Sequence, residues 1–294
     1  MTALLEYAIV GGLLYGIFFG LVAVGLNLIF GVMRIINLAH GEFVVLGGFG
    51  AYWLTSAFGL NPLWGVPLAA LGAVVIGFPL YYAIVPRLQR SRDPEMLSFI
   101  LFFGLAQVIE ALVTLGFGPD QRTLPSDALG SGSPSVFGQA FPESWWWAAG
   151  ISVVAIVGLW LYLTRTRLGF ATRAIMANRD EALATGISVD RVSSIAFIIG
   201  LALAGAAGVF VPYLQGSVAP GIGNDLTTTS FAILIIGSLG NPIGTLLGGL
   251  VFGVGSMLMQ TFYASWSNLV PYVLLVAIVL IRPQGLFGKS VRHA

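Results

Sequence analysis

The chain alternates long apolar runs with short polar segments. Six of these runs approach or exceed the length of a bilayer crossing, at residues 8–30, 43–58, 62–85, 96–117, 145–164 and 192–214. A membrane-spanning helix needs roughly 20 apolar residues, with about 17 as the lower limit. A further uncharged stretch covers residues 226–281, and it is interrupted by Asn241-Pro242 and by residues 268–271. This pattern predicts an all-α, polytopic integral membrane protein.

The last uncharged stretch is too long for one crossing. Its pieces at 226–240 and 268–281 are short for complete spans, so we expect broken or re-entrant helices there. The number of crossings in the first 86 residues stays open for the same reason. We expect about eight or nine transmembrane helices in a single membrane domain that covers residues 1–294.

Composition supports a membrane location. Hydrophobic residues make up 57% of the chain and charged residues 9%, against about 25% charged in an average soluble domain. The net charge of +1 argues against nucleic acid as a partner. The absence of cysteine excludes disulfide and thiol chemistry within this chain.

The basic residues predict the orientation. The basic residues form three groups along the chain. Because loops rich in Lys and Arg stay on the cytoplasmic side, these groups place their three segments, and with them the C-terminus, in the cytoplasm. The loop 118–144 carries Pro and Gly turns and is followed by Trp145, Trp146 and Trp147, which is typical of a periplasmic loop that ends at an aromatic interface belt. The three basic groups are Arg87, Arg90 and Arg92; Arg165, Arg167, Arg173, Arg179 and Arg191; and Arg282, Lys289 and Arg292.

The segment INLAHGEF gathers polar groups inside an apolar region. Asn37 is a candidate N-cap for the apolar run that follows, and Gly41 allows a bend or a close backbone approach. His40 and Glu42 would be costly in lipid without partners. Two interpretations stay open: a helix break that lines the solute path, or a short solvated turn in the cytoplasm.

Residues 165–191 predict a short surface helix. Asn178 and Glu181 form a pair that resembles a capping box, and Asp180 adds a second acid to the first turn, where acids suit the helix dipole. Gly186 is placed to end this helix, and Ser188 to cap the next one.

The face of this predicted helix is small and apolar beside charged Arg179 and Glu181. We expect it to expose Ala182, Leu183 and Ala184. The segment is interpreted either as a docking surface or as an ordinary ordered loop.

Further polar residues lie inside predicted spans. Gln107 and Glu110 are three apart and share one helix face. The stretch 225–230, which includes Thr228, precedes a short apolar piece and suits the start of a half-helix. These side chains either contact solute or tie helices together.

The chain shows no catalytic pattern. The sequence GLFGKS at 285–290 invites comparison with a phosphate-binding loop, but that motif requires glycine where this chain has Pro283. There is no HExxH zinc motif either. We therefore expect that the chain is not an enzyme and has no ATPase site of its own.

Four ordered motifs carry a family resemblance. They are GLNLIFGVMRIINLAHGEFVVLGGFGAYWL, LGFATRAIMANRDEALATGISVDRVSSIAF, GSLGNPIGTLLGGLVFG and RPQGLFGK. Together they resemble the permease family of branched-chain amino acid ABC importers, the LivH/LivM type. The resemblance implies a multi-pass protein of the bacterial inner membrane. It implies four further proteins: a second, paralogous permease, two ATP-binding subunits and a periplasmic solute-binding protein. ATP and Mg would bind to the ATPase subunits, and this chain would bind no cofactor.

The resemblance also assigns roles to residues. A cytoplasmic coupling helix would contain Arg179 and Asp180 and the degenerate motif Glu181, Ala182, Leu183 and Ala184, followed by Gly186, with Leu183 in place of the usual second Ala. The NxAHGE element corresponds to Asn37, Ala39, His40, Gly41 and Glu42 and would line or shape the pathway. The solute would be a branched-chain amino acid or a related small solute, such as urea, an amide or a small organic acid.

The alternative is a self-sufficient secondary transporter or channel for a small polar solute. Such proteins usually carry ionisable side chains within the membrane, and Glu42 and Glu110 are the candidates here. The capped helix at 179–185 separates the two hypotheses, because a secondary transporter does not need it.

Overall fold

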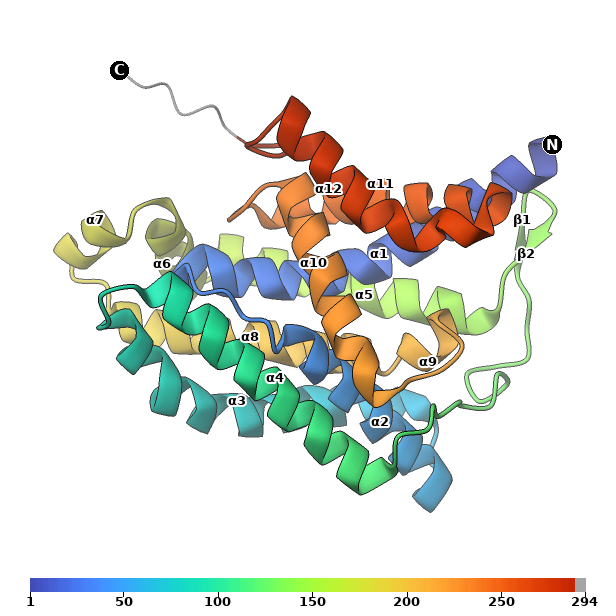
Figure 1. Ribbon diagram of the computed structural model, residues 1–294, viewed down its shortest axis with the longest axis horizontal. Coiled ribbons are helices and arrows are strands. Elements are labelled where there is room, and N and C mark those ends of the chain that lie inside the picture. The colour runs from blue at the N-terminus through green and yellow to red at the C-terminus, as the bar shows by residue number, and fades with distance from the viewer. Residues whose placement is uncertain (289–294) are drawn as a thin grey trace.

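The computed structural model describes residues 1–288 and shows a bundle of helices with one small hairpin (Figure 1). The extreme C-terminus, which we predict to be cytoplasmic, and Lys289 lie outside the described residues. The elements are α1 (Thr2–Met33), α2 (His40–Phe58), α3 (Gly65–Gln89), α4 (Pro94–Phe117), β1 (Ser135–Val136), β2 (Gln139–Ala140), α5 (Glu143–Arg165), α6 (Arg167–Ala177), α7 (Arg179–Ala184), α8 (Val189–Gly208), α9 (Val211–Leu214), α10 (Gly223–Gly237), α11 (Pro242–Phe262) and α12 (Val270–Ile281), with 3-10 turns at Pro62–Trp64, Pro220–Ile222 and Ala264–Leu269.

Seven helical segments of the described chain are long and apolar enough to cross a membrane. They are α1, α4, α5, α8, α11, α3 with its preceding 3-10 turn, and α12 with its preceding 3-10 turn. The two shorter helices α2 and α10 each begin at a break inside the bundle and complete a passage together with the segment before them (Figure 1). The all-α membrane fold with broken helices is therefore confirmed.

Glycines bring α1 and α11 into close contact. A Cβ atom on Gly12 would lie 2.6 Å from the Cα of Val254, and one on Gly16 would lie 2.7 Å from the carbonyl oxygen of Gly249. Lipid supplies no hydrophobic drive between helices, so close packing of small residues is a main source of helix association. The glycine spacing in both helices serves this contact.

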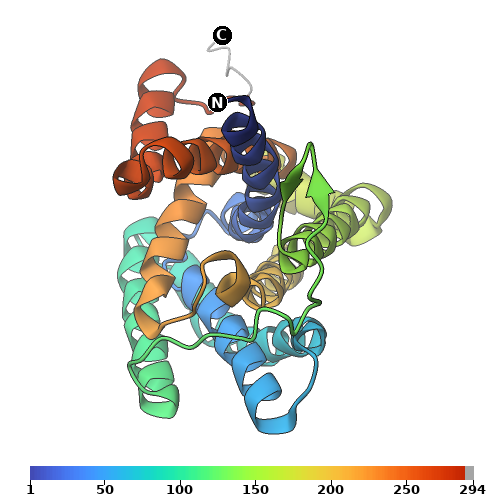
Figure 2. The same cartoon turned by 90° about the vertical axis from the view of Figure 1, so that its right-hand side faces the viewer.

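The two ends of the bundle differ. One end carries α6, α7 and the α3–α4 connection, and the other carries the N-terminus and the β1–β2 hairpin (Figures 1 and 2). At the hairpin end, the loop before α5 is tied to the chain before α10, because the backbones of Arg122 and Val218 exchange two hydrogen bonds of 2.8 Å. Helix α5 begins at Glu143, so Trp145, Trp146 and Trp147 lie in its first turns.

Candidate translocation and coupling sites

The INLAHGEF segment forms a break between α1 and α2. Helix α1 ends at Met33, and its C-cap Arg34 has a left-handed backbone with φ of 53° and donates its N–H to the Phe30 carbonyl at 2.7 Å. Helix α2 begins at His40 with Ala39 as its N-cap, so our prediction of Asn37 as N-cap is wrong. The Asn37 side-chain oxygen instead accepts the Ala39 N–H at 3.1 Å and stabilises the turn before the helix.

The polar residues of this segment are completely buried. Asn37, His40 and Glu42 are each 0% exposed. His40 donates from Nε2 to the carbonyl oxygen of Val22 at 2.9 Å, which ties the start of α2 to the middle of α1. Burial of this extent contradicts the interpretation as a solvated turn.

The start of α2 meets the start of α10. The Gly41 N–H donates to the Thr227 hydroxyl at 2.8 Å, and that hydroxyl also lies 2.9 Å from the Gly223 carbonyl oxygen. A Cβ atom on Gly41 would overlap the Gly223 carbonyl oxygen, and one on Gly223 would overlap the Glu42 carboxylate. We call residues 37–42 with Gly223 and Thr227 the break junction.

Glu42 lies where the N-termini of the two half-helices converge. Neither of its carboxylate oxygens has a hydrogen-bond partner among residues 1–288. The N-terminal end of a helix carries partial positive charge, so a carboxylate there experiences a favourable field from both α2 and α10. The break junction thus places a buried acid beside the N-termini of two half-helices.

A second group of polar side chains lies on the surface of α4 and α10. Gln107, Thr228 and Asp225 are exposed, and Glu110 is half-buried. The 3-10 turn before α10 approaches α4 here, since a Cβ atom on Gly221 would lie 3.6 Å from Oε1 of Glu110. Polar and charged groups at bilayer depth usually face a protein neighbour or a wet cavity rather than lipid.

The predicted pathway residues therefore fall into two sets. Gln107 and Thr228 reach the surface of the subunit, whereas Asn37, His40, Gly41 and Glu42 lie inside it. The buried set shapes the breaks in α2 and α10 and does not contact either of the two cavities described below. A transport role for either set stays a prediction.

Helix α7 is held by its own capping residues. The Asn178 side-chain oxygen accepts the N–H groups of Asp180 at 3.1 Å and Glu181 at 3.3 Å. The Asn178 amide donates to the Glu181 carboxylate at 2.7 Å. Gly186 follows the helix with φ of 82°, a left-handed conformation that favours glycine. The predicted start and end of this helix are confirmed.

The face of α7 differs from our prediction at one residue. Ala182 is only 4% exposed because it points toward the bundle, so it cannot belong to an exposed docking face. Leu183 is 50% exposed, and Asp180, Glu181, Ala184 and Gly186 are exposed as well. Arg179 is half-buried and donates to Gln89 at the end of α3 at 3.0 Å. This hydrogen bond links the start of α7 to the end of α3.

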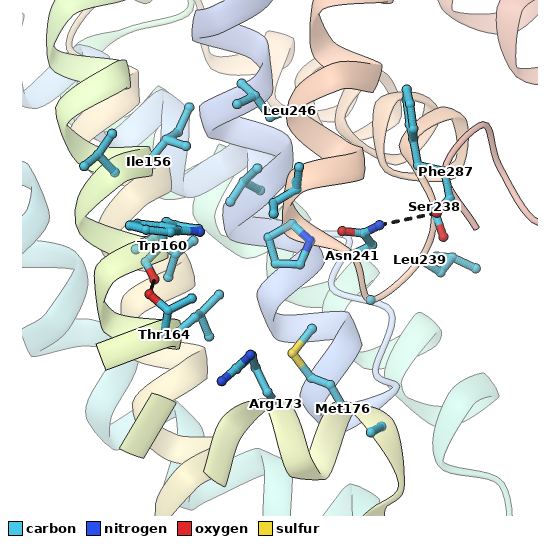
Figure 3. Close-up of a pocket in the computed structure, with 18 residues that line it drawn as sticks. Ile156, Trp160, Thr164, Arg173, Met176, Ser238, Leu239, Asn241, Leu246 and Phe287 are labelled. Atoms are coloured by element: carbon cyan, nitrogen blue, oxygen red, sulfur yellow. Dashed lines mark hydrogen bonds between the residues drawn. The ribbon is translucent and has the colours of Figure 1, made fainter. Parts of the chain in front are cut away.

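Two cavities open on the subunit. The first, of about 820 Å³, lies near the α6 end between α1, α5, α6 and the start of α11 (Figure 3). The Arg173 side chain points into it from α6, and Trp160 of α5 lines another part of its wall. The second, of about 800 Å³, is lined by residues of α1, α5, α9, α10, α11 and the segment that leads into α12. Sequence reasoning missed both, because their walls come from segments far apart in the chain.

These features define a polytopic membrane protein with broken helices and a capped helix at one end. The family described as "Branched-chain amino acid transport system / permease component" matches residues 8–279. The chain belongs to this family.

Three relatives illustrate the similarity. LivH, a high-affinity branched-chain amino acid permease protein of Salmonella typhimurium, is 26% identical over 95% of this chain and 94% of its own length. BraD of Pseudomonas aeruginosa, with the same description, is 27% identical over 96% and 95%. The LivM permease protein of Salmonella typhimurium is 26% identical over 92% of this chain and 68% of its own length. No solved structure matches the chain.

Proposed function

We propose that this chain is one membrane subunit of a binding-protein-dependent ABC importer for a branched-chain amino acid or a related small solute. The observation that carries the proposal is α7, a capped helix whose Leu183 and Ala184 are exposed at one end of a membrane permease. An isolated channel has no need of such a helix, whereas an importer uses one to receive force from an ATPase subunit. Membership in the permease family supports the same assignment.

The proposed orientation follows from charge. The α6–α7 end carries arginines such as Arg90, Arg167 and Arg191, so it belongs in the cytoplasm of a bacterial cell whose inner membrane the chain spans. With α2 and α10 counted as passages beside the seven longer segments, this orientation puts the N-terminus and the β1–β2 hairpin outside and the C-terminus inside. The periplasmic solute-binding protein would dock at the hairpin end.

The exposed polar face of α4 and α10 is the proposed pathway face. Gln107 and Thr228 lie on it, beside Glu110 and Asp225. A second permease would cover this face, and solute would pass between the two subunits. The similarity to both LivH and LivM supports a paralogue as that second permease.

In the proposed mechanism, two ATPase subunits bind ATP and Mg and close on one another. Their closure pushes α7, and the hydrogen bond between Arg179 and Gln89 passes the movement to α3, which packs against α8. The bundle changes from outward-facing to inward-facing, and hydrolysis resets it. ATP binding drives this change only if the ATPases hold one conformation more tightly than the other.

The test is a tagged purification in mild detergent, from cells that also express the neighbouring genes. We expect two ATPase subunits and a second permease to accompany this chain. Proteoliposomes of the complex should accumulate solute when ATP is supplied and an uncoupler has collapsed the ion gradients. Uptake that depends on an ion gradient and not on ATP would contradict this proposal. It would support the alternative, a secondary transporter that uses Glu42 and Glu110.

A further inference from the structure

The cavity near the α6 end is basic at its mouth and apolar farther in. Arg173 lines it from α6, whereas Ile156 and Leu246 line it deeper in the bundle (Figure 3). Because a helix rises about 1.5 Å per residue, Ile156 lies about 14 Å along α5 from the end of that helix at Arg165. The volume of about 820 Å³ is within the range of small-molecule sites.

Arg173 is a cation without a counter-ion. It is exposed and forms no salt bridge or hydrogen bond with another residue among 1–288, although its guanidinium carbon lies 4.9 Å from the ring centroid of Phe170 on the same helix. Stacking of this kind orients a guanidinium and leaves its N–H groups free for an anion. No second charged residue is among the described residues that line the cavity. Arg173 therefore gives the cavity a single positive pole.

Two further features suit an anion at headgroup depth. Asn241 and Pro242 line the cavity where the 21-residue helix α11 begins, and the N-terminal end of a helix carries partial positive charge. Trp160 lines the cavity from the last turns of α5 and is 44% exposed. Tryptophan is enriched where membrane and water meet, because its ring is apolar and its indole N–H donates a hydrogen bond.

The cavity opens on an apolar outer face of the subunit. Val157 and Ile243 line it and are 47% and 59% exposed. Helix α5 lies on the opposite side of the bundle from α4, whose polar face is proposed to meet the second permease (Figure 2). Lipid therefore reaches this face. A free phosphate ion would gain nothing from the apolar walls, whereas a phospholipid has both an anionic headgroup and an apolar chain.

We propose that this cavity binds an anionic phospholipid from the leaflet on the α6–α7 side of the membrane. The lipid phosphate pairs with Arg173, and an acyl chain lies along Ile156 and Leu246. Basic pockets between transmembrane helices bind anionic headgroups in this way. The site goes beyond the proposed function, because it takes a lipid and not the transported solute. The proposed orientation serves only to identify the leaflet as the cytoplasmic one.

The test is native mass spectrometry of the purified, complete transporter. The complex is delipidated in mild detergent and titrated with phosphatidylglycerol or with phosphatidylethanolamine of the same acyl chains. Arg173→Gln should weaken the binding of one phosphatidylglycerol about fivefold, since a basic side chain near a membrane surface contributes on that order. Arg173→Lys should retain most of the affinity. Phosphatidylethanolamine has no net charge, so it should bind native and Arg173→Gln complexes alike. Equal binding of phosphatidylglycerol to native and Arg173→Gln complexes would overturn the proposal.

The matched control is Arg167→Gln. Arg167 is exposed on the same helix but lies six positions earlier, which places it about 120° away around the helix and outside the cavity lining. This variant should bind phosphatidylglycerol like the native complex. A loss equal to that of Arg173→Gln would assign the effect to the general positive charge of this end and overturn the proposal.

A second pair of variants tests the apolar part of the cavity. Val157→Trp narrows it and should weaken phosphatidylglycerol binding although Arg173 is intact. Val154→Trp adds the same bulk at a position of α5 that is 72% exposed and outside the lining, so it should have no effect. The same result for both variants would overturn the proposal.

Two other occupants are distinguished in the same preparation. Millimolar inorganic phosphate should not displace the bound phosphatidylglycerol, and displacement would identify a site for a soluble anion instead. The ATPase subunits should still accompany the Arg173→Gln variant. Their loss would assign Arg173 to the ATPase contact and overturn the lipid site.

Discussion

The break junction and helix α7 look alike in sequence and opposite in structure. Each places an asparagine a few residues before a glutamate, among small residues and beside an apolar run. Asn37 and Glu42 are completely buried, whereas Asn178 and Glu181 are exposed. In both places the asparagine side chain accepts backbone N–H groups and stabilises a turn. Only at α7 do all of the acceptors at the helix start come from neighbouring residues.

The difference lies in what completes each turn. At α7, Asn178 satisfies the first N–H groups of its own helix, so the helix needs no distant partner. At the break junction, Gly41 relies on Thr227, a residue far along the chain. One element is suited to present a surface, and the other holds two broken helices together. Four substitutions test this contrast.

The largest effect is expected for Gly41→Ala. The new methyl group would overlap the Gly223 carbonyl oxygen, and backbone on both sides leaves little room to adjust. Overpacking of this kind costs about 3 kcal/mol, enough to lower the melting temperature markedly or prevent recovery of folded protein. Detergent-solubilised melting measures it. The control Gly50→Ala lies on the same helix, where no atom would lie within 4 Å of the methyl group, and should melt like the native chain.

Ala184→Arg should leave the subunit folded and abolish transport. The side chain is exposed on α7, so a bulky cation is tolerated by the bundle but obstructs a docked ATPase. Co-purification of the ATPase should be lost while membrane insertion persists. Ser133→Arg, at the other end of the molecule, is the matched control and should keep the ATPase bound. Normal uptake by the Ala184→Arg variant would show that the ATPase does not dock at this face of α7.

A smaller effect is expected for Thr227→Val. The valine keeps the shape of threonine but leaves the Gly41 N–H without its acceptor, at a cost of about 1–3 kcal/mol. Thr114→Val is the matched control, because the Thr114 hydroxyl bonds only to the carbonyl oxygen of Glu110 in its own helix. Equal melting temperatures for the two variants would show that the hydroxyl does not hold α2 against α10.

The smallest effect is expected for Asn178→Ala. Loss of a helix cap costs about 1 kcal/mol, and here the loss is confined to α7. Hydrogen exchange at the Asp180 and Glu181 amides should accelerate roughly fivefold, the rate change that corresponds to this free energy. Asn61→Ala removes a comparable cap from the turn before α3 and should leave α7 exchange unchanged.

Local patterns predicted much of the fold. The apolar runs identified the membrane-spanning helices, because lipid requires about 20 apolar residues wherever the chain crosses. The interruption at Asn241-Pro242 marks the start of α11, since Asn241 caps the helix and Pro242 occupies its first turn. The start and end of α7 were predictable for the same reason, as capping groups act within a few residues.

Other features depend on distant contacts. Nothing near Ala182 indicates that it faces inward, and nothing near Asp225 indicates that Ser256 lines the same cavity. The sequence also left open whether the break junction is buried or solvated, because a turn of the same sequence is stable in water or in a protein interior. Helix packing decides such questions, and α1 and α11 pack through glycines more than 200 residues apart.

The amino-acid sequence alone determined the all-α membrane architecture, the capped helix α7 and the likeness to branched-chain amino acid permeases. The first two depend on the length of apolar runs and on short-range hydrogen bonds, which act within a few residues. The third depends on motifs that can be recognised directly in the sequence. Only the tertiary structure decided that Glu42 lies between two helix N-termini and that Asp225 and Ser256 share a cavity. Such sites arise when segments remote in the chain are brought together, and the free energy of that packing is not carried by any one segment.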